Sequence, residues 1–168
     1  MDKNLYLLAE FDEATQIKFR EFEEIIIYSS LSGTQTKNIP YHITLGSFSS
    51  DCENYLVNML DEIGKIKSAF DLTFSSLGLF GLKVLFLNPD MSRELIELHD
   101  FTKGKSLHRD DSLAAHATVL IDEPENILKI LPPLAEKFRA FRGKIRYVSL
   151  YEFFPARFIG RTELRDRA

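Results

Sequence analysis

The 168-residue sequence contains a single cysteine, Cys52, so no disulfide can form within the chain. This scarcity excludes a disulfide-stapled scaffold and fits a reducing compartment. The sequence also lacks any hydrophobic run approaching the ~20 residues of a membrane-spanning helix. Its first apolar run, Leu5–Ala9, is too short for a secretory signal sequence. We therefore expect a soluble cytoplasmic protein with no membrane partner.

The sequence also lacks linkers and low-complexity segments. Hydrophobic residues make up 45% of the chain and charged residues 27%, which is an ordinary globular composition. A chain of this length buries roughly 70% of its unfolded surface, enough for a core without staples. These features predict one domain over residues 1–168.

The net charge of −4 gives no bulk reason to bind nucleic acid, but the charge is unevenly distributed. Residues 137–168 carry nine Lys or Arg and three acids, a net +6, which leaves −10 for the first 136 residues. A basic C-terminal fifth could meet a phosphate-rich partner. A solvated basic edge explains the same distribution.

The hydrophobic pattern predicts an α+β domain. The predicted strands cover 5–10, 40–46, 70–77, 82–87, 115–121, 144–154 and 159–164, and the predicted helices cover 13–28, 51–64, 91–101 and 124–141. Asp12 is the expected N-cap of the first helix. Helices separated by one or two strands indicate a layered domain. The order also suggests two similar halves, each with one strand that holds a histidine.

Two tetrads share one pattern. His-Ile-Thr-Leu occupies 42–45 and His-Ala-Thr-Val occupies 116–119, each in a predicted strand. Because side chains alternate along a strand, a histidine and a threonine two residues apart project from the same face. His42 with Thr44 and His116 with Thr118 would therefore offer two imidazoles and two hydroxyls to one shared surface.

These groups suit the hydrolysis of a cyclic phosphodiester. An unperturbed imidazole titrates near pH ~6.5, so one of a pair can be neutral and the other protonated. One would activate water as general base, and the other would protonate the leaving alkoxide as general acid. Threonine hydroxyls can donate to the phosphoryl oxygens as charge builds on them. This chemistry needs no cofactor, and no carboxylate or cysteine lies beside either histidine at zinc-ligand spacing.

The paired motifs resemble those of the 2H phosphoesterase superfamily, in its 2'-5' RNA ligase-like and cyclic phosphodiesterase branch. Segments 80–87 and 148–152 are also similar to strands of that family, so the resemblance covers nearly the whole chain. It implies a bilobal fold in which two pseudo-symmetric lobes with antiparallel sheets line a central cleft and the helices lie outside. It also implies that His42 and His116 are the acid/base pair and that Thr44 and Thr118 bind phosphate.

The resemblance further implies action on 2',3'-cyclic or 1'',2''-cyclic phosphates, or on 2'-5' linkages in RNA. The negative charge of the first 136 residues argues against a long RNA track, so a small phosphodiester stays as an alternative substrate. Lys105 and Arg109, in the polar loop before the second motif, could reach a substrate phosphate or base. Tyr151, on a neighbouring strand, could stack on a base. The structural alternative for Lys105 and Arg109 is a solvated loop, and the alternative for Tyr151 is packing in the core.

We therefore predict a cyclic phosphodiesterase or 2'-5' RNA ligase-like hydrolase that uses no cofactor and no metal. Its partner would be a small cyclic phosphodiester or an RNA terminus, and no protein partner is implied. The alternative is a non-catalytic module that holds a nucleotide or RNA end in the same cleft. A third interpretation is an interaction domain with a vestigial cleft. The residues alone leave open which histidine is the base.

Overall fold

The computed structural model describes residues 3–107 and 113–168. The α-helices among them are α1 (Glu13–Tyr28), α2 (Glu53–Ile66), α3 (Arg93–Thr102) and α4 (Pro124–Lys137), with short 3₁₀ helices η1 (Ser50–Cys52) and η2 (Lys103–Lys105). The strands are β1 (Asn4–Phe11), β2 (His42–Ser49), β3 (Phe70–Phe80), β4 (Val84–Pro89), β5 (Ala117–Ile121), β6 (Phe141–Phe153) and β7 (Arg157–Glu163). The predicted α+β class is confirmed. No helix in this part of the chain is both long and apolar enough to cross a membrane.

The strands form one antiparallel sheet in the order β2-β1-β6-β3-β4-β5, with β7 also paired to β6. If β1, β2 and β3 are exchanged with β4, β5 and β6 respectively, the same strand order is obtained, read from the opposite edge of the sheet. The sheet therefore has a pseudo-twofold axis that passes between β6 and β3. β6 completes the half of the sheet that contains β1 and β2, and β3 completes the half that contains β4 and β5. The two expected lobes are thus joined in one sheet, because the first residues of β6 pair with β3.

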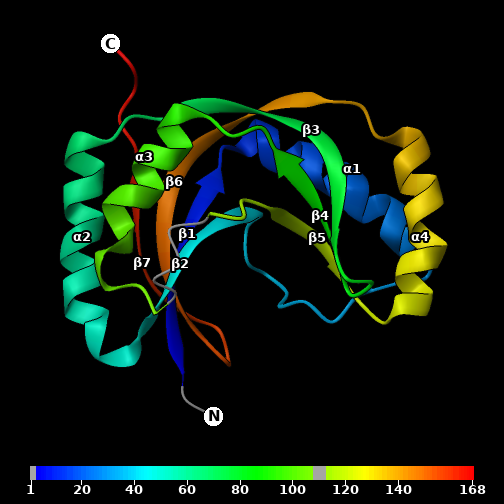
Figure 1. Ribbon diagram of the computed structural model, residues 1–168, viewed down its shortest axis with the longest axis horizontal. Coiled ribbons are helices and arrows are strands. Elements are labelled where there is room, and N and C mark those ends of the chain that lie inside the picture. Colours follow the sequence, from blue (N-terminus) through cyan, green and yellow to red (C-terminus); the bar gives the residue numbers. More distant parts are fainter. Residues whose placement is uncertain (1–2, 108–112) are drawn as a thin grey trace.

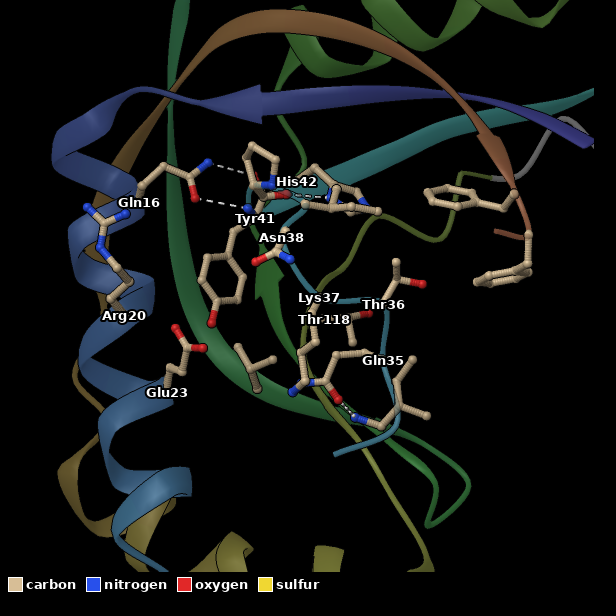
Figure 2. Close-up of a pocket in the computed structure, with 16 residues that line it drawn as sticks. Gln16, Arg20, Glu23, Gln35, Thr36, Lys37, Asn38, Tyr41, His42 and Thr118 are labelled. Atoms are coloured by element: carbon tan, nitrogen blue, oxygen red, sulfur yellow. Dashed lines mark hydrogen bonds between the residues drawn. The ribbon is translucent and has the colours of Figure 1, made fainter. Parts of the chain in front are cut away.

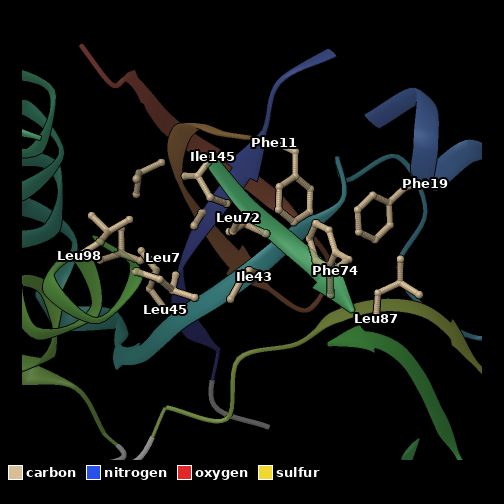
Figure 3. Close-up of a cluster of buried hydrophobic side chains, with 14 of the residues drawn as sticks. Leu7, Phe11, Phe19, Ile43, Leu45, Leu72, Phe74, Leu87, Leu98 and Ile145 are labelled. Carbon is tan, nitrogen blue, oxygen red and sulfur yellow. The ribbon is translucent and has the colours of Figure 1, made fainter. Parts of the chain in front are cut away.

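The helices cover one face of this sheet. In Figure 1, α2 and α3 flank one half of the arched sheet, and α1 and α4 flank the other. Alternate strand residues such as Leu7, Ile43, Leu72 and Leu87 pack under the helices in a continuous buried core (Figure 3). The other strand residues form a second face, which we call the motif face because it carries His42, Thr44, His116 and Thr118.

The first helix begins where the sequence predicts. The Asp12 carboxylate accepts a hydrogen bond from the Thr15 amide at 2.9 Å, as an N-cap does. The end of α4 differs from the prediction: the helix stops at Lys137 instead of 141, and β6 begins at Phe141 instead of 144. Phe141 lies opposite Phe74 in the β3–β6 ladder, and their ring centroids are 5.1 Å apart. Pairing with a distant strand therefore overrides the helical pattern.

Two loops hold the halves of the sheet together. The loop between α1 and β2 reaches β5, where the Thr34 amide donates to the Ile121 carbonyl at 2.6 Å. The loop after α3 reaches β2, where the Leu107 amide donates to the Ser47 carbonyl at 2.8 Å. Ser47 and Ile121 each lie five residues after a motif histidine, so the two contacts are related by the pseudo-twofold. These contacts keep β2 and β5, the outermost strands in the order, close together.

Replacing Gly143 of β6 with alanine should destabilise the protein. A Cβ at this position would lie 2.7 Å from the Thr15 methyl carbon, which cannot withdraw because Thr15 Oγ1 accepts from the Lys144 amide at 3.0 Å. We expect the free energy of unfolding, measured in urea, to fall by about 1–3 kcal/mol. Gly104→Ala is the control, because its nearest neighbour would be the Tyr55 hydroxyl at 3.8 Å. Equal losses in the two variants would contradict this packing constraint.

Candidate active site

The two motif threonines occupy equivalent positions in the sheet. Thr44 lies opposite Leu8 of β1, directly after a bulge between Leu7 and Leu8. Thr118 lies opposite Phe86 of β4, directly after a bulge between Leu85 and Phe86. In both motifs the apolar residues are buried in the core while the histidine and threonine are partly exposed. The alternation predicted from sequence therefore places all four polar side chains on the motif face.

Both imidazoles are held in the same way. Nδ1 of His42 lies 2.7 Å from the carbonyl oxygen of Pro40, and Nδ1 of His116 lies 2.7 Å from that of Ala114. A carbonyl oxygen can only accept, so Nδ1 must carry the hydrogen in each ring. In a neutral ring this leaves Nε2 with a free lone pair. Each histidine is thus fixed through a residue two positions before it, and Nε2 is left as the nitrogen that can accept a proton.

The two histidines have different surroundings. Burial is the largest influence on His42 and lowers its pKa, the hydrogen bond to Pro40 raises it, and repulsion from His116 lowers it again. This repulsion shows that the two imidazoles are close enough to interact electrostatically. His116 packs edge-on against the Phe80 ring, with centroids 4.7 Å apart, and its centroid lies 5.3 Å from that of Phe86.

A pocket of about 460 Å³ opens beside the motifs. His42 and Thr118 line it, which brings one residue from each motif to a single cavity (Figure 2). The remaining wall comes from α1, from the loop before β2, from β5 and from the end of β6: Gln16, Arg20, Glu23, Gln35, Thr36, Lys37, Asn38, Ile39, Pro40, Tyr41, Val119, Ile121, Phe153 and Phe154. The pocket therefore combines amides, charged groups and aromatic rings beside an imidazole and a hydroxyl.

Gln16 positions the first motif and was not anticipated from sequence. Its Nε2 donates to the Tyr41 carbonyl at 2.8 Å, and its Oε1 accepts from the Tyr41 amide at 2.9 Å. Figure 2 shows this amide holding the backbone directly before His42. The sequence signal that could have identified Gln16 is a polar residue on the buried side of a helix. In the structure, Gln16 is only 7% exposed. Such a residue must find internal partners.

Of the predicted substrate-binding residues, Tyr151 and Lys105 do not line this pocket. Tyr151 is 9% exposed and packs between Phe153 and Phe158. Phe153, two residues further along β6, does line the pocket. Lys105 lies near the far end of β2, with its ammonium 4.3 Å from the centroid of the Tyr55 ring. The structure does not bring Lys105 to the pocket. Arg109 lies outside the described residues.

Most of the positive charge in the C-terminal fifth is matched within the chain. Six of its nine basic residues form ion pairs: Arg142 and Lys144 with Asp71, Arg146 with Glu163 and Asp166, Arg157 with Glu53 and Glu152, Arg161 with Glu10, and Arg167 with Glu94. This pairing leaves less charge for an external phosphate-rich partner than the sequence implies. In the described part of the chain, no three His, Cys, Asp or Glu side chains gather to form a metal-ion site.

No protein-family model and no curated protein match this sequence. Solved structures do match. The complex of E. coli LigT with 3'-AMP superposes with a TM-score of 0.62 at 16% identity, covering 97% of this chain and 98% of LigT. The chain has the LigT fold. LigT has also been solved in complex with ATP, NADP+ and phosphate.

Two further solved structures have the same fold as this chain. The protein TT0787 of Thermus thermophilus gives a TM-score of 0.66 at 10% identity, covering 98% of this chain and 100% of that protein. A structure described as a phosphoesterase gives 0.59 at 18% identity, covering 99% and 100%. The likeness to LigT and to this phosphoesterase is one of fold, and it extends over nearly the whole chain.

The His42 imidazole should titrate below the ordinary histidine pKa of about 6.5. Burial disfavours its charged form in the folded state, so the unfolded chain binds this proton at a higher pH than the folded chain does. The stability contributed by neutral His42 should therefore be lost as pH falls through 6.5 toward the folded pKa. A ¹H–¹⁵N NMR titration of the side chain measures it directly. A midpoint at or above 6.5 would contradict the lowered pKa of this imidazole.

Proposed function

We propose that this protein is a phosphoesterase that hydrolyses a cyclic phosphodiester by two-histidine acid–base catalysis. The observation that carries the proposal is the pseudo-twofold pair of imidazoles, each with Nδ1 tied to a carbonyl and Nε2 free. The LigT fold and the nucleotides that LigT binds support a small nucleotide or an RNA end as the substrate. A 2',3'-cyclic nucleotide is the simplest substrate that needs this set of groups.

His42 is the general base in this proposal, because burial keeps its imidazole neutral. Its Nε2 takes a proton from water as the water oxygen attacks phosphorus. His116, protonated at Nε2, gives that proton to the departing ribose oxygen as the P–O bond breaks. The product is a phosphomonoester, and exchange with solvent returns both histidines to their starting protonation states.

The threonine hydroxyls stabilise the reacting phosphate. Charge builds on the non-bridging oxygens in the transition state, and donors placed there in advance lower the barrier. Thr44 and Thr118 flank the phosphate from the two halves of the sheet, each two residues beyond its histidine. With a ribose 5'-hydroxyl in place of water as the nucleophile, the same groups would join RNA ends: the 5'-oxygen bonds to phosphorus, the bond to the 3'-oxygen breaks, His116 protonates that oxygen, and a 2'-5' linkage results. A binding module without turnover stays as the alternative, and the experiments below separate it.

Replacing either motif histidine should abolish most turnover. We expect His42→Gln and His116→Gln each to lower kcat for nucleoside 2',3'-cyclic monophosphates by about 100- to 10,000-fold, since each removes a proton-transfer group. His99→Gln, in α3 and outside both motifs, is the matched control and should keep full activity. All assays contain EDTA, and circular dichroism checks folding. Variants that lose affinity without losing turnover, or wild type that binds without turnover, would favour the binding module.

The threonines can be tested without disturbing the strands. Valine keeps the β-branched shape of threonine but removes the hydroxyl. Thr44→Val and Thr118→Val should each lower kcat by about 100-fold, with a smaller effect on KM, because the hydroxyls act mainly in the transition state. Thr73→Val on β3 is the control, since Thr73 belongs to neither motif. Unchanged kcat in both motif variants would remove the threonines from the mechanism.

A further inference from the structure

A buried carboxyl group lies beside His42 on the motif face. Glu10 of β1 is directly opposite His42 in the β1–β2 ladder, and it is only 1% exposed. Its Oε1 accepts a hydrogen bond from the Ser149 hydroxyl at 2.5 Å. Its Oε2 has no hydrogen-bond partner among the described residues and faces Nε of Arg161 at 3.4 Å. Burial raises the pKa of Glu10, while the Ser149 hydrogen bond and the positive charge of Arg161 favour its ionised form.

Arg161 is held from two sides. It lies on β7 opposite Ser149, and its guanidinium carbon is 3.5 Å from the centroid of the Tyr147 ring. Tyr147 therefore fixes one flat side of the guanidinium, and Glu10 fixes the Nε edge. The side chain is still 40% exposed. Its two terminal amino groups have no partner within residues 3–107 and 113–168, so up to four N–H donors stay available on the motif face.

This guanidinium lies within reach of a substrate held by His42. Glu10 is on the strand next to His42, and Tyr147 is on the strand after that. Neighbouring strands are about 4.8 Å apart, so the guanidinium lies about 10 Å across the sheet from His42. A nucleoside with a phosphate at each end of its ribose can span that gap. A planar guanidinium matches the oxygens of a phosphate, and charge-assisted bonds of this kind are strong.

We propose that Arg161, oriented by Glu10 and Tyr147, binds a second phosphate of the substrate, one attached to the ribose 5'-oxygen. The proposal rests on the function proposed above for the reacting phosphate and narrows its substrate class. The preferred substrate is then a cyclic phosphodiester that carries a further 5'-phosphate, either as a free monoester or as the preceding link of an RNA strand. A nucleoside cyclic phosphate without a 5'-phosphate would contact the two motifs but would leave Arg161 without a ligand.

The test compares adenosine 2',3'-cyclic phosphate with and without a 5'-phosphate, and a dinucleotide that ends in a 2',3'-cyclic phosphate. Wild type should have a KM about tenfold lower for the two substrates with a 5'-phosphate, at similar kcat. Arg161→Gln should remove this preference, so that the three substrates have equal KM values. Glu10→Gln should weaken it, because Arg161 loses the carboxylate that orients it. A preference for the monoester alone would identify a mononucleotide, and a preference for the dinucleotide would identify an RNA end.

Arg142→Gln is the matched control, because it removes the same charge from an exposed pair with Asp71. It should keep the wild-type preference. Two results would overturn the proposal: a preference that survives Arg161→Gln, or an Arg161→Gln variant whose kcat falls equally for all substrates. The second result would place Arg161 on the reacting phosphate or in the stability of the fold, and urea unfolding of the variant separates these two roles.

Binding measurements separate this proposal from the proposed function. Isothermal titration calorimetry compares adenosine 3'-monophosphate with adenosine 3',5'-bisphosphate, and neither compound needs turnover. The bisphosphate should bind wild type about tenfold more tightly, and Arg161→Gln should bind the two compounds equally. If no cyclic phosphate is hydrolysed but this difference is found, the second-phosphate site stands and the catalytic function fails. If hydrolysis is found without the difference, the second-phosphate site fails alone.

Discussion

β6 belongs to both halves of the sheet, and the position of the candidate site depends on that pairing. Its first residues pair with β3, and the rest pair with β1 on one edge and β7 on the other. The strand order is consequently symmetric, so β2 and β5 become the outermost strands. The loops that bond to Ile121 and Ser47 then draw these strands together. The pairing therefore sets the separation of the two motif histidines.

The two halves share a backbone plan but differ in the side chains beside each motif. Next to the first motif, Glu10 and Ser149 form a buried polar pair capped by Arg161. At the place equivalent to Ser149 beside the second motif, Gly78 lies opposite Phe86, where an added Cβ would be 2.3 Å from the ring. One imidazole is thus flanked by ionisable groups and the other by aromatic rings. In the proposed mechanism, this difference is the basis for giving the two histidines different roles.

Local sequence signals predicted the parts of this structure that depend on neighbours in the chain. Asp12 marked the start of α1 correctly, and the alternation around His42 and His116 correctly placed each histidine with its threonine. Contacts between distant segments could not be predicted in the same way. The start of β6 is set by pairing of Phe141 with Phe74, and the ion pair of Glu10 with Arg161 joins the two ends of the chain. Lys105 was misplaced for the same reason, since loop direction is decided by packing on β2 and α2.

In the proposed mechanism, His42 and His116 face one phosphate. The most direct measurement is a titration of the protein with inorganic phosphate, followed through the ¹H–¹⁵N NMR signals of the imidazole nitrogens. Both Nε2 signals should shift along the titration with one common Kd, while the signals of His99, which lies in α3 outside the pocket, stay in place. A shift at only one of the two histidines, or two different Kd values, would contradict a shared site.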